Sequence, residues 1–273
     1  MTNEIQKSNS SSKMTFSAFI TSSGMKNKIN QIIGDEKTGN RFISSIISAV
    51  STNPSLAECD NASIVSGALL GEALKLSPSP QLGLYYLVPF NLKDRGKVAQ
   101  FQLGYKGYIQ LAIRSGQYKK LNVLAIKEGE LIKYDPLNEE IEVKLIDDEV
   151  KREKAKTIGY YAMFEYTNGF RKSMYWSKEK MEKHALQYSK GYQAKKGSTF
   201  WEKDFDSMAY KTMLRQIISR WGIMSIDMQN AYEADMAVIH DDGTKEYVDN
   251  VNYEDEIMDA TFIETKSLDD IEW

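Results

Sequence analysis

The sequence contains very little cysteine and histidine. Its 273 residues include one cysteine, Cys59, and two histidines, His184 and His240. A single thiol excludes an internal disulfide and a zinc site built from several cysteines. The histidines are far apart in the chain, so we expect no metal site built on a histidine pair, and we place His184 on a helix surface. Cys59 is expected to be a small buried hydrophobic residue.

Long apolar runs are also absent. The longest candidates, such as residues 82–90, are shorter than the roughly 18 apolar residues that span a bilayer. The N-terminus is rich in Ser and Asn and lacks the apolar stretch of a secretory signal. Hydrophobic residues make up 42% and charged residues 27% of the chain, with a mean hydropathy of -0.47. This composition is typical of a soluble globular protein, so we expect a cytoplasmic protein without membrane association.

Sequence patterns for nucleotide hydrolysis are missing. The phosphate-binding pattern G-x-x-x-x-G-K-[ST] does not occur, so we predict no dependence on ATP. Carboxylates at 139–140 and 147–149 are in principle able to hold magnesium. They fall in charged, loop-like stretches, and solvated turns are the favoured interpretation. We predict that the protein is not an enzyme and needs no cofactor.

Charge is distributed unevenly along the chain. Residues 233–273 contain 14 Asp and Glu against two Lys, a net charge of -12. Residues 1–232 contain 33 Lys and Arg against 24 Asp and Glu, a net charge of +9, although the whole chain carries only -3. A basic body is typical of polyanion-binding proteins, and an acidic segment is typical of a solvated or partner-docking tail. The alternative is that both charges only keep the protein soluble.

These patterns predict three parts. Residues 1–35 form an N-terminal arm that begins with a polar, disordered stretch. Residues 36–232 form the folded core, and residues 233–273 form a flexible acidic tail that either docks a partner or is disordered. At the start of the core, apolar spacing predicts a helix ending near Thr52 and a second helix capped by Asp60 or Asn61.

The middle of the core changes to strand-like patterns. Residues 84–90 and 98–103 predict a β-hairpin, and a helix follows at 105–115, ending at Gly116. Four further segments read as strands, at 121–126, 141–146, 158–166 and 170–176, and two as helices, at 178–187 and 199–221. Repeated strand-helix-strand units are missing, so we predict an α+β fold: a small antiparallel sheet with hairpins, packed by helices, with N-terminal helices and an acidic C-terminal tail.

Basic side chains recur at helical spacing in two segments. Lys106 and Arg114 lie about 80° apart on the helix that begins at Tyr105, so both are expected to face one groove. Lys211 and Arg215 are four residues apart on the last helix and share a face, with Lys203 on the same broad side.

Gly104 and Gly107 flank the start of the first of these helices. Because glycine has no side chain, we expect close backbone approach at that helix N-terminus.

A basic, aromatic loop precedes the last helix. Residues 189–198 carry Lys195 and Lys196, and Phe200 follows at the helix start. We expect Phe200 to stack on bases and the lysines to grip a phosphate backbone. An ordinary surface loop is the alternative. Together with Tyr105, these residues complete the candidate DNA-binding set, whose members are Tyr105, Lys106, Arg114, Lys195, Lys196, Phe200, Lys203, Lys211 and Arg215.

Several of these segments resemble one known family. The stretches FQLGYKGYIQLAIRSGQY (101–118) and FWEKDFDSMAYKTMLRQI (200–217) are similar to RecT-type (Redβ-like) single-strand annealing proteins of phages and prophages. An early Asn-Pro-x-Leu at 53–56, the Tyr-Leu-x-Pro-Phe at 86–90 and the Met-Ala-x-Lys-Thr-x-x-Arg at 208–215 occur in the order of the family. The resemblance extends from about Asn53 to Trp221.

The resemblance implies an ATP-independent recombinase of a bacterial host's cytoplasm that binds single-stranded DNA and anneals complementary strands. It implies a homo-oligomer, either a ring or a helical filament, with an annealed duplex as intermediate and Mg²⁺ at most as a modulator. It implies a 5'-to-3' exonuclease and a host single-strand binding protein as partners. By the same resemblance, Lys106, Arg114, Lys211 and Arg215 contact the DNA backbone.

Two other functions stay open from the residues. A passive single-strand coating protein needs the same basic groove but does not accelerate pairing. A metal-dependent nuclease needs, in addition, a convergent carboxylate cluster, which the sequence does not identify. The acidic tail is interpreted either as a separable docking segment or as a segment that limits nonspecific DNA binding.

Overall fold

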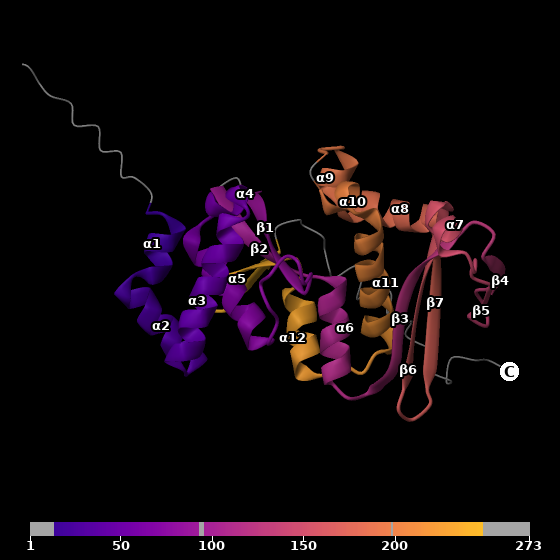
Figure 1. The fold of residues 1–273 in the computed structure, drawn as a ribbon, viewed down its shortest axis with the longest axis horizontal. Helices are drawn as coiled ribbons and strands as arrows, with labels where there is room; N and C mark the ends of the chain where they lie inside the picture. The colour runs from indigo at the N-terminus through magenta and orange to yellow at the C-terminus, as the bar shows by residue number, and fades with distance from the viewer. Residues whose placement is uncertain (1–13, 93–95, 198, 248–273) are drawn as a thin grey trace, which may run out of the picture.

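The computed structural model describes residues 14–92, 96–197 and 199–247, and these ranges form an α+β protein. Figure 1 shows a group of N-terminal helices at one end and a long antiparallel sheet at the other, with further helices between them. All the described strand pairs are antiparallel, as the sequence predicts. Within these ranges, no helix combines the length and apolar character needed to cross a membrane.

Five helices precede the first strand. They are α1 (Phe16–Thr21), α2 (Ser23–Ile33), α3 (Glu36–Ser51), α4 (Pro54–Ala57) and α5 (Asn61–Ala73). The side chains of Asp35 and Asp60 cap α3 and α5 by accepting hydrogen bonds from backbone N–H groups. Apolar residues of α1, α2, α3 and α5 bury one another in a single cluster. Residues 16–33, which fall in the predicted N-terminal arm, are therefore helices packed on the body; residues 1–13 lie outside the described residues.

The predicted hairpin is present and belongs to a larger sheet. β1 (Tyr85–Leu92) and β2 (Gly96–Leu103) pair along their full lengths. β8 (Ala237–Ile239) pairs with β2, and β9 (Lys245–Tyr247) pairs with β8. The charge pattern assigns residues 237–247 to the acidic tail, but the structure incorporates them in this sheet. Residues 248–273, the rest of that predicted tail, lie outside the described residues.

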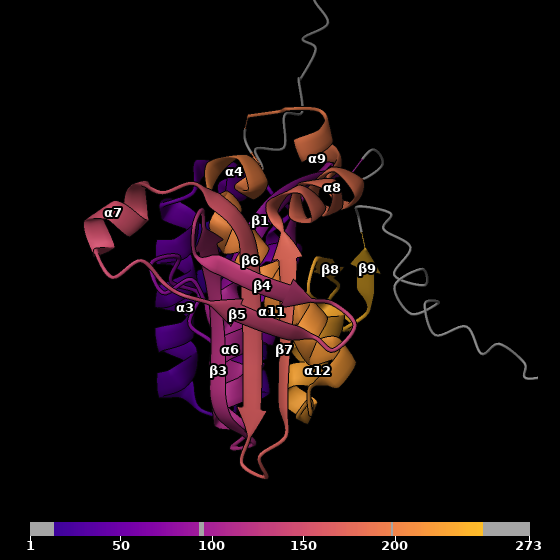
Figure 2. The same cartoon turned by 90° about the vertical axis from the view of Figure 1, so that its right-hand side faces the viewer.

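The second sheet has the order β3-β6-β7. Its strands are β3 (Tyr118–Lys127), β6 (Thr157–Tyr166) and β7 (Arg171–Ser177), so β7 is an edge strand. The segment between β3 and β6 forms the β4 (Leu131–Asp135) and β5 (Glu140–Val143) hairpin and the short helix α7 (Glu149–Lys154). Figure 2 shows this hairpin lying across the face of the sheet, on the side away from α11.

The remaining helices connect the two sheets. They are α6 (Tyr105–Arg114), α8 (Lys178–Tyr188), α9 (Lys190–Gln193), α10 (Phe200–Lys203), α11 (Phe205–Trp221) and α12 (Ile226–Ala234). α11 packs against α6, β3, β6 and β7, and nearly all of its middle residues are buried. The predicted continuous helix from 199 to 221 is interrupted at Asp204, whose backbone is not helical. The Asp204 carboxylate accepts a hydrogen bond from the Ser207 N–H (3.0 Å) and so begins a new helix.

Candidate nucleic-acid interface

Two of the predicted DNA contacts lie inside the protein. The Lys211 side chain is 8% exposed, and its Nζ lies 2.7 Å from Oδ1 of Asp235. The Arg215 guanidinium donates hydrogen bonds to Oδ2 of Asp235 (3.3 Å) and to the Tyr108 hydroxyl (3.2 Å). Asp235 is fully buried and also accepts from the Leu103 N–H (2.9 Å). The two cations thus neutralise a buried carboxylate and join α11, α6 and β2.

This arrangement corrects the prediction that Lys211 and Arg215 face a groove. Their spacing of four residues does place them on one helix face, but that face is turned inward. Asp235 falls in the segment 233–273, whose net charge is typical of a solvated tail, so its role as their partner was not predicted. Buried charges require an opposite charge nearby, so two cations on a core helix were the signal that a carboxylate had to be found.

Lys106 and Arg114 are both exposed residues of α6. They stand at opposite ends of α6, which is about 15 Å long by its rise per residue. The Arg114 guanidinium donates to the carbonyl oxygen of Leu74 (2.7 Å) and lies 3.4 Å from a carboxylate oxygen of Asp227. Arg114 therefore ties the end of α6 to α5 and α12.

The glycines at the start of α6 allow a close approach, but to the protein's own backbone. A Cβ at Gly104 would overlap the carbonyl oxygen of Gly83, and a Cβ at Gly107 would overlap that of Leu84. The Gly104 N–H donates to the Leu84 carbonyl (2.9 Å). These contacts press α6 against the chain that enters β1. They explain the glycines by packing, so the glycines do not indicate a ligand.

Aromatic rings and cations do gather on one surface beside the start of α6. The Tyr86 ring of β1 lies 5.5 Å from the Phe200 ring of α10. Lys106 is exposed, with its Nζ 6.0 Å from the centre of the Tyr105 ring. Phe200 is 39% exposed. With Lys203, the exposed last residue of α10, these residues form what we call the α6–α10 surface: Tyr86, Tyr105, Lys106, Phe200 and Lys203.

The basic loop beside this surface has a defined conformation. Thr199 and Glu202 form a reciprocal capping box at the start of α10. The Glu202 carboxylate also accepts a hydrogen bond from the Gly197 N–H (2.8 Å), which fastens the end of the loop. Lys195 and Lys196 are exposed, and Lys195 has a left-handed backbone with φ of 49°. The loop thus presents both lysines to solvent from an anchored base.

One cation near this region was not predicted. Lys178, the first residue of α8, lies 3.5 Å from the centre of the Phe205 ring and 3.1 Å from the Tyr160 hydroxyl. Burial lowers the pKa of Lys178, although the nearby Asp206 carboxylate opposes this shift. The sequence around Lys178 did not predict these contacts, because the two aromatic rings belong to elements that are distant in the chain.

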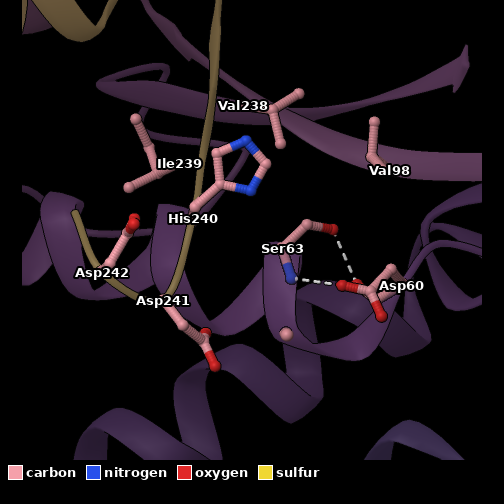
Figure 3. Close-up of a pocket in the computed structure, with 9 residues that line it drawn as sticks. Asp60, Ser63, Val98, Val238, Ile239, His240, Asp241 and Asp242 are labelled. Atoms are coloured by element: carbon pink, nitrogen blue, oxygen red, sulfur yellow. Dashed lines mark hydrogen bonds between the residues drawn. The ribbon is translucent and has the colours of Figure 1, made fainter. Parts of the chain in front are cut away.

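One cavity, at α5 and the β2–β8 sheet, has the wrong charge for DNA. It measures about 640 Å³ and lies between α5, β2 and β8. Figure 3 shows the carboxylates of Asp60, Asp241 and Asp242 around it, with His240 above. Asp60 is engaged in capping α5. Within the part of the chain that the structure describes, no three His, Cys, Asp or Glu side chains are grouped to hold a metal ion.

His184 of α8 is half-buried between aromatic rings and is not fully on the helix surface. Its ring lies 5.5 Å from the Trp176 ring and 4.5 Å from the Tyr188 ring. Burial lowers the pKa of His184 to about 4, and the positive charges of Arg215 and Lys180 add to this shift. Its imidazole is therefore neutral at pH 7. Cys59 is buried, as predicted.

This chain is similar in sequence to known proteins. A sequence model of the RecT family matches residues 40–249. The uncharacterized protein YqaK of Bacillus subtilis is 42% identical over 249 residues, which cover 90% of this chain and 79% of that protein. Protein RecT of Escherichia coli is 28% identical over 221 residues, covering 80% of this chain and 79% of RecT. The family match includes β8 and β9, and it confirms the resemblance seen in the sequence motifs: this chain belongs to the RecT family.

Proposed function

We propose that this protein binds single-stranded DNA on the α6–α10 surface and anneals complementary strands without nucleotide hydrolysis. Membership of the RecT family supports a role in DNA recombination through single-strand binding and annealing. The observation that carries the location is the combination of the exposed Phe200 ring and two half-buried tyrosine rings with exposed lysines on one surface. Rings stack on bases without sequence preference, and lysines neutralise phosphates.

The chemistry of annealing needs no covalent step. Two complementary strands repel each other through their phosphates, and their bases are not ordered for pairing. Lys106 and Lys203 reduce the first barrier by neutralising phosphates, and Phe200 and Tyr105 reduce the second by holding bases in a stack. Lys195 and Lys196 add charge from the anchored loop beside α10. Base pairing then supplies both the specificity and the free energy of the reaction.

The proposal assigns Lys211, Arg215 and Arg114 to the scaffold. Their charges are directed at Asp235 and Asp227, and Lys211 and Arg215 are buried. A phosphate would have to displace Asp235 from both cations to reach them. They hold α6 and α11 in place below the α6–α10 surface and so support it indirectly.

Assembly and partners belong to the same proposal. We propose a homo-oligomer, a ring or a filament, in which the N-terminal helices contribute subunit contacts through exposed apolar residues such as Ile32 of α2 (57% exposed). An annealed duplex is the intermediate that the oligomer holds. A 5'-to-3' exonuclease and a host single-strand binding protein in the bacterial cytoplasm are the proposed partners, and the acidic residues after Tyr247 are the proposed docking segment.

An annealing assay tests this function. Two complementary, fluorescently labelled strands are mixed with the purified protein in the absence of nucleotide, and strand length is checked afterwards on a denaturing gel. We expect faster duplex formation with intact strands. Binding without acceleration would replace annealing by passive coating, and shortened strands would indicate a nuclease.

A further inference from the structure

A second cluster of cations and rings lies along the free edge of β7. It lines a cavity of about 160 Å³ on the edge strand of the β3-β6-β7 sheet. The β4–β5 hairpin forms one wall, the end of α11 forms the other, and Lys180 of α8 closes one end. The lining residues used below are Tyr134, Glu139, Lys172, Lys180, Arg220 and Trp221. We call this the β7-edge groove.

The groove has an excess of positive charge. Three cations line it, Lys172, Lys180 and Arg220, against one carboxylate, Glu139. Glu139 forms an ion pair with Lys172. In the described ranges, no carboxylate lies within ion-pair distance of Lys180 or Arg220. Lys180 and Arg220 are both exposed. Partial burial and the positive charge of Arg220 lower the pKa of Lys180, as expected for two cations that lie near each other.

Aromatic rings accompany these cations. Trp221 is 49% exposed, and Tyr134 is 40% exposed. The Lys172 Nζ lies 3.6 Å from the centre of the Trp221 ring, and Tyr134 packs edge-on against Tyr175 with centroids 5.0 Å apart. Each ring is thus fixed by a neighbour while much of its surface stays exposed. Fixed, half-exposed rings beside a cluster of cations with a net positive charge are the elements that single-stranded nucleic acid requires.

The size of the groove favours an extended polymer over a small molecule. At 160 Å³ it is smaller than the roughly 300 to 1,000 Å³ of pockets that enclose drug-sized ligands. It extends along β7 from Lys172 to Trp176, about 13 Å by the rise of a strand. That length corresponds to about four stacked base steps at roughly 3.4 Å each. A strand can therefore lie along the groove with only part of each nucleotide enclosed.

We propose that the β7-edge groove is a second contact site for single-stranded DNA, with phosphates between Lys180 and Arg220 and bases against Trp221 and Tyr134. It is separate from the α6–α10 surface, because Arg220 lies at the opposite end of α11 from α10. One protein that holds strand segments at two separate sites brings two polyanions close before pairing. This inference rests on the proposed function, since it adds a second site to the same activity.

Neutralisation of Lys180 and Arg220 tests the site. The logarithm of single-strand affinity falls linearly with the logarithm of salt concentration, and each neutralised phosphate contributes about 0.7 to the magnitude of this slope. The slope of K180Q/R220Q should therefore be smaller in magnitude than that of the wild type by about 1.4. The matched control is K151Q/K154Q, which removes the same charge from two exposed lysines of α7. Affinities for oligo(dT) are measured by fluorescence anisotropy over a range of salt concentrations with the full chain. An unchanged slope in K180Q/R220Q, or an equal change in the control, would overturn the second site.

Crosslinking locates the contact independently. A bromodeoxyuridine-substituted strand is irradiated on the wild-type protein, and crosslinked peptides should contain Trp221 or Tyr134. Crosslinks confined to other peptides would overturn the assignment. A third outcome would also overturn the assignment. If K180Q/R220Q keeps the wild-type salt dependence for DNA but no longer binds a peptide with the sequence of residues 248–273, the groove binds an acidic segment and not DNA. Failure of the wild-type protein to bind any single strand would instead contradict the proposed function itself.

Discussion

Replacement of Asp235 by Asn tests the interpretation of the buried charge cluster. Asp235 is 0% exposed and accepts hydrogen bonds from Leu103, Tyr108, Lys211 and Arg215. The amide of Asn has nearly the same volume as the carboxylate, so the change leaves little cavity. It removes the carboxylate that pairs with both Lys211 and Arg215.

The expected loss is large. Breaking a buried ion pair by removing one partner costs about 3 to 5 kcal/mol, because the other charge stays buried without compensation. For a chain of this size, each kcal/mol lowers Tm by about 2 to 4 °C, so D235N should melt about 10 °C below the wild type. The control D227N removes an exposed carboxylate that pairs with Arg114, and it should change stability by less than about 1 kcal/mol.

The pH dependence of this loss gives a second readout. Burial lowers the pKa of Lys211, and the Asp235 carboxylate opposes that shift. Without Asp235 the folded protein releases the lysine proton more easily than the unfolded chain does. Stability of D235N should therefore rise with pH, and its difference from the wild type should narrow as pH rises towards the ordinary lysine pKa of 10.5. A D235N protein that melts within about 2 °C of the wild type at pH 7, by circular dichroism, would refute the buried-cluster interpretation.

Three further predictions follow from the packing and the interface. Phe200→Ala should weaken single-strand binding by about 1 to 3 kcal/mol, because the variant has no ring to stack on a base. Fluorescence anisotropy measures this affinity, and Tm should not change. An affinity equal to that of the wild type would contradict the role of Phe200. Gly107→Ala should destabilise the protein by about 1 to 3 kcal/mol, because its Cβ meets the Leu84 carbonyl, whereas Gly24→Ala, with open space around it, should not; equal urea midpoints would contradict this. The pKa of His184 is lowered to about 4 in the folded protein, so the unfolded chain takes up its proton more readily. The free energy of unfolding is therefore highest above about pH 6.5 and decreases as pH falls towards 4. Urea unfolding should therefore show about 2 kcal/mol less stability at pH 5 than at pH 7, and His184→Phe should remove that difference.

Local patterns predicted the elements that local chemistry determines. The β1–β2 hairpin, α6 with its left-handed end at Gly116, and the β6–β7 hairpin at Gly169 were all predicted from sequence. The regular spacing of apolar residues and the residues at the turns determine both hairpins and α6. The short helix α1 and the strand β8 were missed, because their few buried residues become apparent only against distant partners.

The buried cluster shows why the surroundings of two predicted site residues could not be read from the sequence. Helical spacing correctly placed Lys211 and Arg215 on one face, but it could not show which way that face points. The direction is decided by Asp235, which packs beside them from a segment whose overall charge resembles a solvated tail. Exposed candidates such as Lys106 and Phe200 needed no such partner, and they do lie on the surface.

The rate of strand annealing by a surface variant tests the central claim most directly. The claim is that single-stranded DNA is held for pairing on the α6–α10 surface. We expect K106E/K203E to reduce the rate of duplex formation by labelled complementary strands about tenfold or more, because two phosphate contacts become repulsive. Tm should be unchanged, since both lysines are exposed, and K151E/K154E, with the same charge change on α7, should anneal at close to the wild-type rate. Equal annealing by K106E/K203E and the wild type would contradict the account.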